Sequence, residues 1–206
     1  MTNTHEYIED PWARVITRNG LKGDEVVSGL QKSIRRGLTK EACEFAYEMY
    51  ITSPQFEEKL WRRLLAISVE DIGMGNVQAA PIINSLNQMR KEFAYNEADR
   101  AMYIFHAIRL LAESEKDRST DLLKNIVIKS FAMGYVPEIP DFALDKHTVR
   151  GQAMGRDSFH FLNEASKVIP EMPVDNGYKE AYAKILETYD PKKVVESAFN
   201  FNSWQI

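Results

Sequence analysis

The chain has 206 residues, with 26 Lys and Arg against 30 Asp and Glu and a formal net charge of -4 at pH 7. This length can bury a full core without disulfides or metals, and 44% hydrophobic with 27% charged residues is typical of an ordinary globular protein. The acidic balance argues against broad, strong nucleic-acid binding through a basic surface, although a local basic patch stays compatible with it.

Several common sequence features are missing. The single cysteine, Cys43, cannot form an internal disulfide, so a reducing, cytoplasmic location is the simplest interpretation. No run approaches the ~18 to 20 apolar residues of a membrane span. Neither a G-x-x-x-x-G-K-[ST] phosphate loop nor a G-x-G-x-x-G pattern after a strand is present. We therefore expect no cofactor, no metal and no membrane contact.

Helical periodicity dominates the chain from Asp24 to Gly134. Apolar residues recur every three or four positions, and capping residues and glycines separate the periodic segments. Asp24, Asn76 and Ser119 are expected to cap three of the helices, and Ser53 with Pro54 to open another. Alternating β-branched runs are nearly absent, and the run Ile126-Val127-Ile128 is assigned to a helix because of its length. The pattern predicts an all-α, multi-helix bundle.

The stretch 60–76, LWRRLLAISVEDIGMGN, has the clearest periodicity. Its apolar residues predict a helix that faces the core, and Gly73 is suited to end that helix. This places Glu70 and Asp71 in the last turn. Carboxylates there oppose the helix dipole by up to ~1 kcal/mol each, so a nearby cation should compensate them.

Two interpretations of these acids remain open. They could form a solvated, acidic helix end, or they could belong to a buried or interfacial ion network with arginines. The candidates on the same helix are Arg62 and Arg63, and those upstream in the chain are Arg35 and Arg36.

The late stretch 135–173 is irregular and contains several prolines and glycines. It concentrates polar residues of the kind that bind ligands, namely Asp145, His147, Thr148, Arg150, Arg156 and His160. Loops on rigid scaffolds often carry function. Asp-x-His with one later His is too sparse to indicate a metal site.

Three roles for this loop stay open. It could be a structural loop or a subunit contact. It could bind a phosphate or another anion through the candidates Thr148, Arg150, Arg156 and His160. It could also act on an anionic substrate, with His147 as the general base and Asp145 orienting it.

The C-terminal part continues with a helix after Gly177, a helix start at Asp190-Pro191 and an aromatic tail. The tail contains Phe199, Phe201 and Trp204, and it should pack on its own domain or on a neighbour. We therefore expect three parts, a lead-in, a helical oligomerisation-like domain and a C-terminal extension. They are residues 1–23, 24–170 and 171–206.

The stretch 60–79 resembles the segment that follows the ATPase core in the replication-associated recombination protein A family, which includes the Werner-helicase-interacting ATPases. The residues that carry the resemblance are Arg62-Arg63-Leu64, Ser68 and Glu70-Asp71-Ile72-Gly73. Upstream, the segment 30–49, LQKSIRRGLTKEACEFAYEM, looks like the same family's pattern. The resemblance covers residues 24–135.

The resemblance implies an all-helical domain of the kind that follows an AAA+ module, similar to a clamp-loader collar, which assembles such proteins into homotetramers. The family's ATP-hydrolysing residues have no counterparts here, and we expect no ATPase module before the matched region. We therefore predict a homo-oligomer, with a tetramer favoured, that acts by binding rather than by catalysis. A replication or repair protein is the expected further partner, and direct nucleic-acid binding is not expected to be strong.

Overall fold

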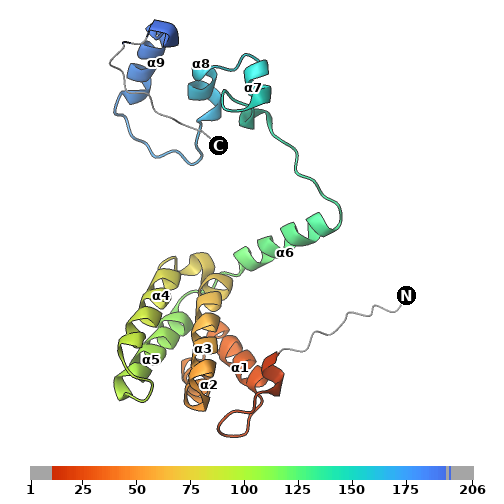
Figure 1. Cartoon of the computed structure of the whole chain (residues 1–206), viewed down its shortest axis with the longest axis vertical. Helices are drawn as coiled ribbons and strands as arrows, with labels where there is room; N and C mark the ends of the chain where they lie inside the picture. Colours follow the sequence, from red (N-terminus) through yellow and green to blue (C-terminus); the bar gives the residue numbers. More distant parts are fainter. Residues whose placement is uncertain (1–10, 194, 196–206) are drawn as a thin grey trace, which may run out of the picture. The chain divides into compact units, whose positions relative to one another are not determined.

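The computed structural model describes residues 11–193 and 195 (Figure 1). Within these residues the chain forms helices and loops and contains no strand, apart from an isolated antiparallel bridge between Ile16 and Lys22. The predicted all-α fold is confirmed. No helix in the described ranges is long and apolar enough to cross a membrane.

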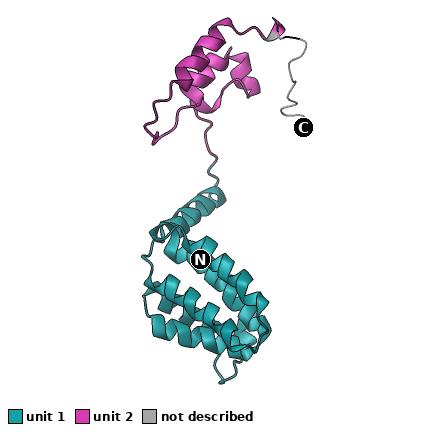
Figure 2. Ribbon diagram, turned by 90° about the vertical axis from the view of Figure 1, so that its left-hand side faces the viewer, with its two compact units in different colours: residues 1–135 teal, residues 136–206 magenta. Residues whose placement is uncertain are grey.

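Residue contacts divide the chain into two compact units, 1–135 and 136–206 (Figure 2). The boundary lies just after Gly134, which follows the last helix of the first unit with a φ of 90°. The three parts expected from the sequence, with a boundary between residues 170 and 171, stay a prediction. The predicted aromatic tail, residues 199–206, lies outside the described residues.

In the described part of the first unit, five helices form a bundle from which a sixth extends (Figure 1). The helices are α1 (Gly23–Arg35), α2 (Thr39–Thr52), α3 (Pro54–Ile67), α4 (Ala79–Met89), α5 (Ala98–Glu113) and α6 (Ser119–Ala132). Helix α2 packs against α1, α3 and α5, and α4 packs against α3 and α5. The run Ile126-Val127-Ile128 is helical, as predicted.

Helix α3 supplies much of the core. Its residues Phe56, Leu60, Trp61, Leu64 and Ile67 are at most 1% exposed, so the predicted apolar stripe does face the core. The helix begins as predicted, because the side chain of Ser53 accepts a hydrogen bond from the N–H of Phe56 at 3.1 Å.

The predicted caps of three other helices are wrong. Asp24 lies in the first turn of α1, because the helix already starts at Gly23 and Lys22 occupies the cap position. Asn76 lies in the turn before α4 rather than at its cap position. Before α6, the carboxylate of Asp117 accepts from the N–H of Ser119 at 2.8 Å, so the acid that precedes Ser119 stabilises the helix start.

The second unit contains the helices α7 (Val149–Ala153), α8 (Ser158–His160) and α9 (Tyr178–Thr188). Thr148 caps α7 by accepting a hydrogen bond from the N–H of Gly151 at 3.0 Å. Asp157 caps α8 by accepting hydrogen bonds from two backbone N–H groups, both at 3.0 Å. Helix α9 has no buried residue in the described part of the chain.

Candidate interaction site

Asp71 is the centre of an ion network. It lies in η2 (Ser68–Ile72), a π-helical turn that continues α3, and its side chain is fully buried. Nε of Arg35 donates to Oδ1 at 2.6 Å, Nη1 of Arg118 donates to the same oxygen at 2.5 Å, and Nε2 of Gln31 donates to Oδ2 at 2.9 Å. One carboxylate therefore ties together α1, the end of α3 and the residue before α6.

The surroundings keep Asp71 charged. Burial by itself raises the pKa of this carboxyl, but the hydrogen bonds from Arg35, Gln31 and Arg118 outweigh burial and hold the pKa below its ordinary value. The network thus supplies the cations that acids at a helix end require.

Glu70 joins the same network from its exposed side. Its Oε2 accepts from Arg63 at 2.9 Å, and its Oε1 accepts from Gln31 at 2.9 Å and lies 3.5 Å from Nη1 of Arg118. From the predicted set, the structure therefore brings together Arg35, Arg63, Glu70 and Asp71. Arg62 is exposed and forms no ion pair within the described residues.

The network also fixes the segment that leads into α6. The N–H of Asp117 donates to the carbonyl groups of Asp71 and Ile72, both at 3.1 Å. We call residues 70–75 the socket, because they hold the backbone of residues 115–118. The direction in which α6 leaves the bundle is set by these contacts.

Gly73→Ala tests how closely the socket packs. Gly73 has a φ of 51°, and a Cβ there would clash with the carbonyl oxygen of Asp117. We expect a loss of about 2 kcal/mol in the free energy of unfolding, measured by urea melting. Gly20→Ala is the matched control, because Gly20 has a φ of 82° with open space around it. Equal losses in the two variants would contradict close packing at the socket.

Helix α6 exposes apolar side chains over most of its surface, and Figure 1 shows it extending away from α1–α5. None of its residues is buried. Six large apolar side chains are 46–62% exposed, namely Leu122, Leu123, Ile126, Val127, Ile128 and Phe131. At ~3.6 residues per turn they cover roughly two-thirds of the circumference. A helix with so wide an apolar face requires neighbours on more than one side.

An apolar hollow of about 250 Å³ lies at the start of α6. Its lining includes Val69, Met74 and Val77, which are 51–71% exposed, and Thr120 from α6 itself. The hollow therefore places these exposed apolar residues beside the first turn of α6. We call α6 together with this hollow the apolar surface.

The irregular loop of the second unit uses two of the predicted anion-binding residues to hold its own backbone. Arg156 donates to the carbonyl oxygens of Asp141 at 2.6 Å and Leu144 at 2.5 Å, and its guanidinium also pairs with the Asp141 carboxylate at 2.5 Å. Thr148 is occupied as the cap of α7. These side chains stabilise the loop.

Asp145 and His147 are paired, as the catalytic alternative requires. Oδ2 of Asp145 lies 2.8 Å from Nδ1 of His147, and the hydrogen bonds from His147 lower the pKa of Asp145. The imidazole is 50% exposed. The described contacts give this ring a polar partner at Nδ1 only, so the pair orients the histidine without bringing a nucleophile to it.

The remaining candidates are not joined to this pair. Arg150 is exposed, and Nδ1 of His160 is buried without a hydrogen-bond partner among the described residues. No described contact links either side chain to Arg156 or Thr148. Over the same residues, no group of three or more His, Cys, Asp or Glu side chains could hold a metal ion.

A second ion network is not apparent from the amino-acid pattern. Glu57 and Arg90 are both fully buried and lie 3.1 Å apart, and Arg100 pairs with the same carboxylate at 2.9 Å. Arg90 also reaches Glu58 at 2.5 Å. The sequence did contain one indication that Glu57 is buried: it follows Phe56 and lies one turn before Leu60, on the core face of α3.

The match to a known protein family covers parts of both units. The family model described as MgsA AAA+ ATPase C terminal matches residues 47–196. The curated relative "Replication-associated recombination protein A" of Bacillus subtilis (strain 168) is 28% identical over 132 residues, which is 64% of this chain and 30% of the relative. The chain thus spans less than a third of that relative's length. Because the family match covers most of the chain, including α3, the socket and α6, this protein belongs to the MgsA AAA+ ATPase C-terminal family.

Proposed function

We propose that this protein is a homo-oligomeric interaction module that acts by binding rather than by catalysis. The observation that carries the proposal is α6, a helix whose apolar side chains are about half exposed or more. Such a surface is unfavourable in water and marks a protein interaction site. The hydrogen bonds from the N–H of Asp117 to the socket hold the start of α6 at a defined place on the first unit, which supports a role in docking.

The size of the exposed surface suits a stable interface. With Met133 and Tyr135, which are 84% and 56% exposed, the apolar side chains of α6 and its end form one group of eight. Together they present on the order of 800 Å², which is about what one partner contributes to a standard interface.

The width of the apolar face favours a tetramer over a dimer. A single neighbouring helix covers one stripe, whereas the apolar face of α6 extends over roughly two-thirds of its circumference. In a closed tetramer each α6 can contact more than one neighbour, and most homo-oligomers have closed symmetry.

A protein of DNA replication or recombination is the proposed further partner. The printed name of the Bacillus subtilis relative associates that protein with replication and recombination. The family to which this chain belongs is defined by the C-terminal part of an AAA+ ATPase. These two facts support a partner in the same process, and a pull-down from the native host would identify it.

Size-exclusion chromatography with light scattering tests the oligomer. A tetramer of the 23.7 kDa chain has a mass of 94.8 kDa (4 × 23.7 kDa), and we expect this mass at micromolar protein concentration. A mass of 23.7 kDa at the same concentration would exclude the oligomer. The mass of a stable dimer would support self-association but would exclude the tetramer.

A further inference from the structure

One hollow of the first unit is lined by three tyrosines. It lies between α2 and the start of α5 and measures about 270 Å³. Tyr47 and Tyr50 come from α2, and Tyr95 comes from the segment just before α5. Pockets for drug-sized molecules typically measure about 300 Å³ or more, so this hollow suits a smaller ligand.

Contacts within the first unit hold the tyrosine rings in place. The hydroxyl of Tyr50 donates a hydrogen bond to the backbone carbonyl of Tyr95, and the hydroxyl of Tyr95 donates to that of Tyr50. The centroids of these two rings lie 5.1 Å apart. The Tyr47 ring stacks on Phe105 with centroids 6.1 Å apart. Because the hydroxyls of Tyr50 and Tyr95 already have internal partners, these residues offer a ligand their rings rather than their polar groups.

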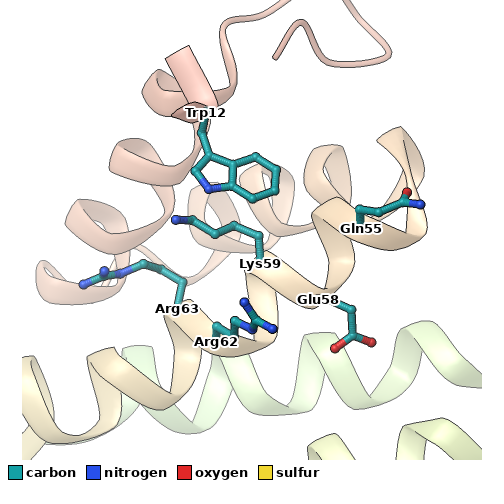
Figure 3. A pocket seen from close by; sticks show the side chains of 6 residues that line it. All are labelled: Trp12, Gln55, Glu58, Lys59, Arg62 and Arg63. Atoms are coloured by element: carbon teal, nitrogen blue, oxygen red, sulfur yellow. The ribbon is translucent and has the colours of Figure 1, made fainter. Parts of the chain in front are cut away.

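The described part of the chain places no cation over these three rings. A larger hollow, between η1 (Pro11–Arg14) and α3, provides the contrast, because Trp12 is the only aromatic residue in its lining. Figure 3 shows the Lys59 side chain beneath the indole ring of Trp12, and Nζ of Lys59 lies 5.1 Å from the ring centroid. The indole therefore has a cation from its own chain, whereas the tyrosines can attract one that a ligand supplies.

Two opposite charges line the tyrosine hollow without pairing with each other. Arg18 and Glu97 are both exposed, and neither forms an ion pair within the described residues. One oxygen of Glu97 accepts a hydrogen bond from the N–H of Ala94 at 3.0 Å. Glu48, a buried acid whose charge interacts with that of Arg18, accepts hydrogen bonds from Asn19. The hollow thus presents one positive and one negative group beside an aromatic wall.

We propose that this hollow binds a small zwitterion that carries a quaternary ammonium group and a carboxylate, of the betaine class. Aromatic rings attract such cations through their electron-rich faces, and several rings around one cation form the usual site. The methylated ammonium lies against Tyr47, Tyr50 and Tyr95, with Glu97 as its counter-charge. The guanidinium of Arg18 binds the ligand carboxylate with two parallel hydrogen bonds.

A quaternary ammonium fits the aromatic wall better than a primary one. A primary ammonium has N–H donors that would lose their hydrogen bonds to water against the tyrosine rings, whereas a quaternary ammonium has none to lose. A cation without a carboxylate leaves Arg18 without an anion, and a carboxylate without the cation leaves the rings unused. Both halves of the zwitterion are therefore needed for full affinity.

Saturation-transfer NMR on the ligand methyl protons, with the full chain and glycine betaine as the probe, tests the proposal. We expect glycine betaine to bind, and we expect choline to bind at least about fivefold more weakly because it lacks the carboxylate. The isosteric carboxylate with a tert-butyl group in place of trimethylammonium should also bind at least about fivefold more weakly, because it lacks the cation.

Two substitutions separate the roles of the rings and the arginine. Tyr47→Leu should weaken the binding of glycine betaine about fivefold, by loss of one ring from the site. Arg18→Gln should weaken the binding of glycine betaine but not that of choline, which has no carboxylate for Arg18 to bind.

Tyr178→Leu is the matched control, because Tyr178 is 74% exposed on α9 and lies outside the hollow. This variant should bind glycine betaine as the unmodified chain does. Circular dichroism melts show whether each variant is folded. The proposal is overturned if glycine betaine does not bind, if choline or the tert-butyl carboxylate binds as tightly as glycine betaine, or if folded Tyr47→Leu and Tyr178→Leu bind alike.

Discussion

Asp71→Asn is expected to lower the free energy of unfolding of the first unit by about 3 kcal/mol. The substitution leaves Arg35 and Arg118 facing a neutral amide in place of a fully buried carboxylate. Breaking a truly buried pair typically costs ~3 to 5 kcal/mol, and the lower end applies because these arginines are 30% and 33% exposed. Urea melting measures the change as a shift of the midpoint at constant slope.

Glu70→Gln is the internal comparison. Glu70 is 27% exposed and shares Gln31 and Arg35 with Asp71, so its loss should cost about 1 kcal/mol or less. If both variants melt at or above the midpoint of the unmodified chain, the acids do not stabilise the fold, and they merely oppose the helix dipole.

The pH dependence gives a second readout of the same carboxylate. The pKa of Asp71 is lower in the folded chain than the ordinary value, so its extra stabilisation is present above the unfolded value of about 3.9. The stabilisation is lost as the pH falls through the lower, folded pKa. The difference between the unmodified chain and Asp71→Asn should therefore shrink below about pH 4.

Leu122→Glu with Ile126→Glu is expected to convert the proposed oligomer to a monomer. The two side chains are 60% and 62% exposed in the single chain and lie one turn apart on α6. Charges there would be buried without partners at every copy of the interface, which costs several kcal/mol per site. Light scattering at micromolar concentration should give a mass of 23.7 kDa, while circular dichroism should show a folded bundle.

Ile16→Glu with Met102→Glu is the control for this experiment. These apolar side chains are 59% and 66% exposed, but they lie in the first unit outside α6 and its hollow. This variant should keep the mass of the unmodified chain. An α6 variant that keeps the oligomeric mass would show that α6 is not the interface.

The helices could be predicted from the sequence because their periodicity is local. The apolar residues of α3 recur at helical spacing whatever the rest of the chain does, and Ser53 with Pro54 marks its start. Only part of the ion network could be predicted from the sequence. Arg63 lies seven residues from Glu70, but Arg118 lies 47 residues from Asp71, and tertiary packing alone brings them together.

Other features could not be predicted from the sequence, because charged and polar residues of the same type are used both at the surface or in ligand sites and in the protein's own structure. Glu57 has the pattern of a surface charge, yet it is fully buried between Arg90 and Arg100. In the late loop, Arg156 and Thr148 look like ligand contacts, but they satisfy backbone carbonyl and N–H groups. Sequence alone cannot separate these roles, since polar loop residues are used for both.

The exposure of α6 has a consequence for how the chain responds to dilution. An isolated helix of 14 residues is marginal in water, and in the single chain α6 gains no buried side chain to stabilise it. Its helical structure is then coupled to self-association, so helix content should fall as the protein concentration is lowered, while α1–α5 stay folded. Amide hydrogen exchange at two concentrations would detect this as protection that changes in α6 and not in α3.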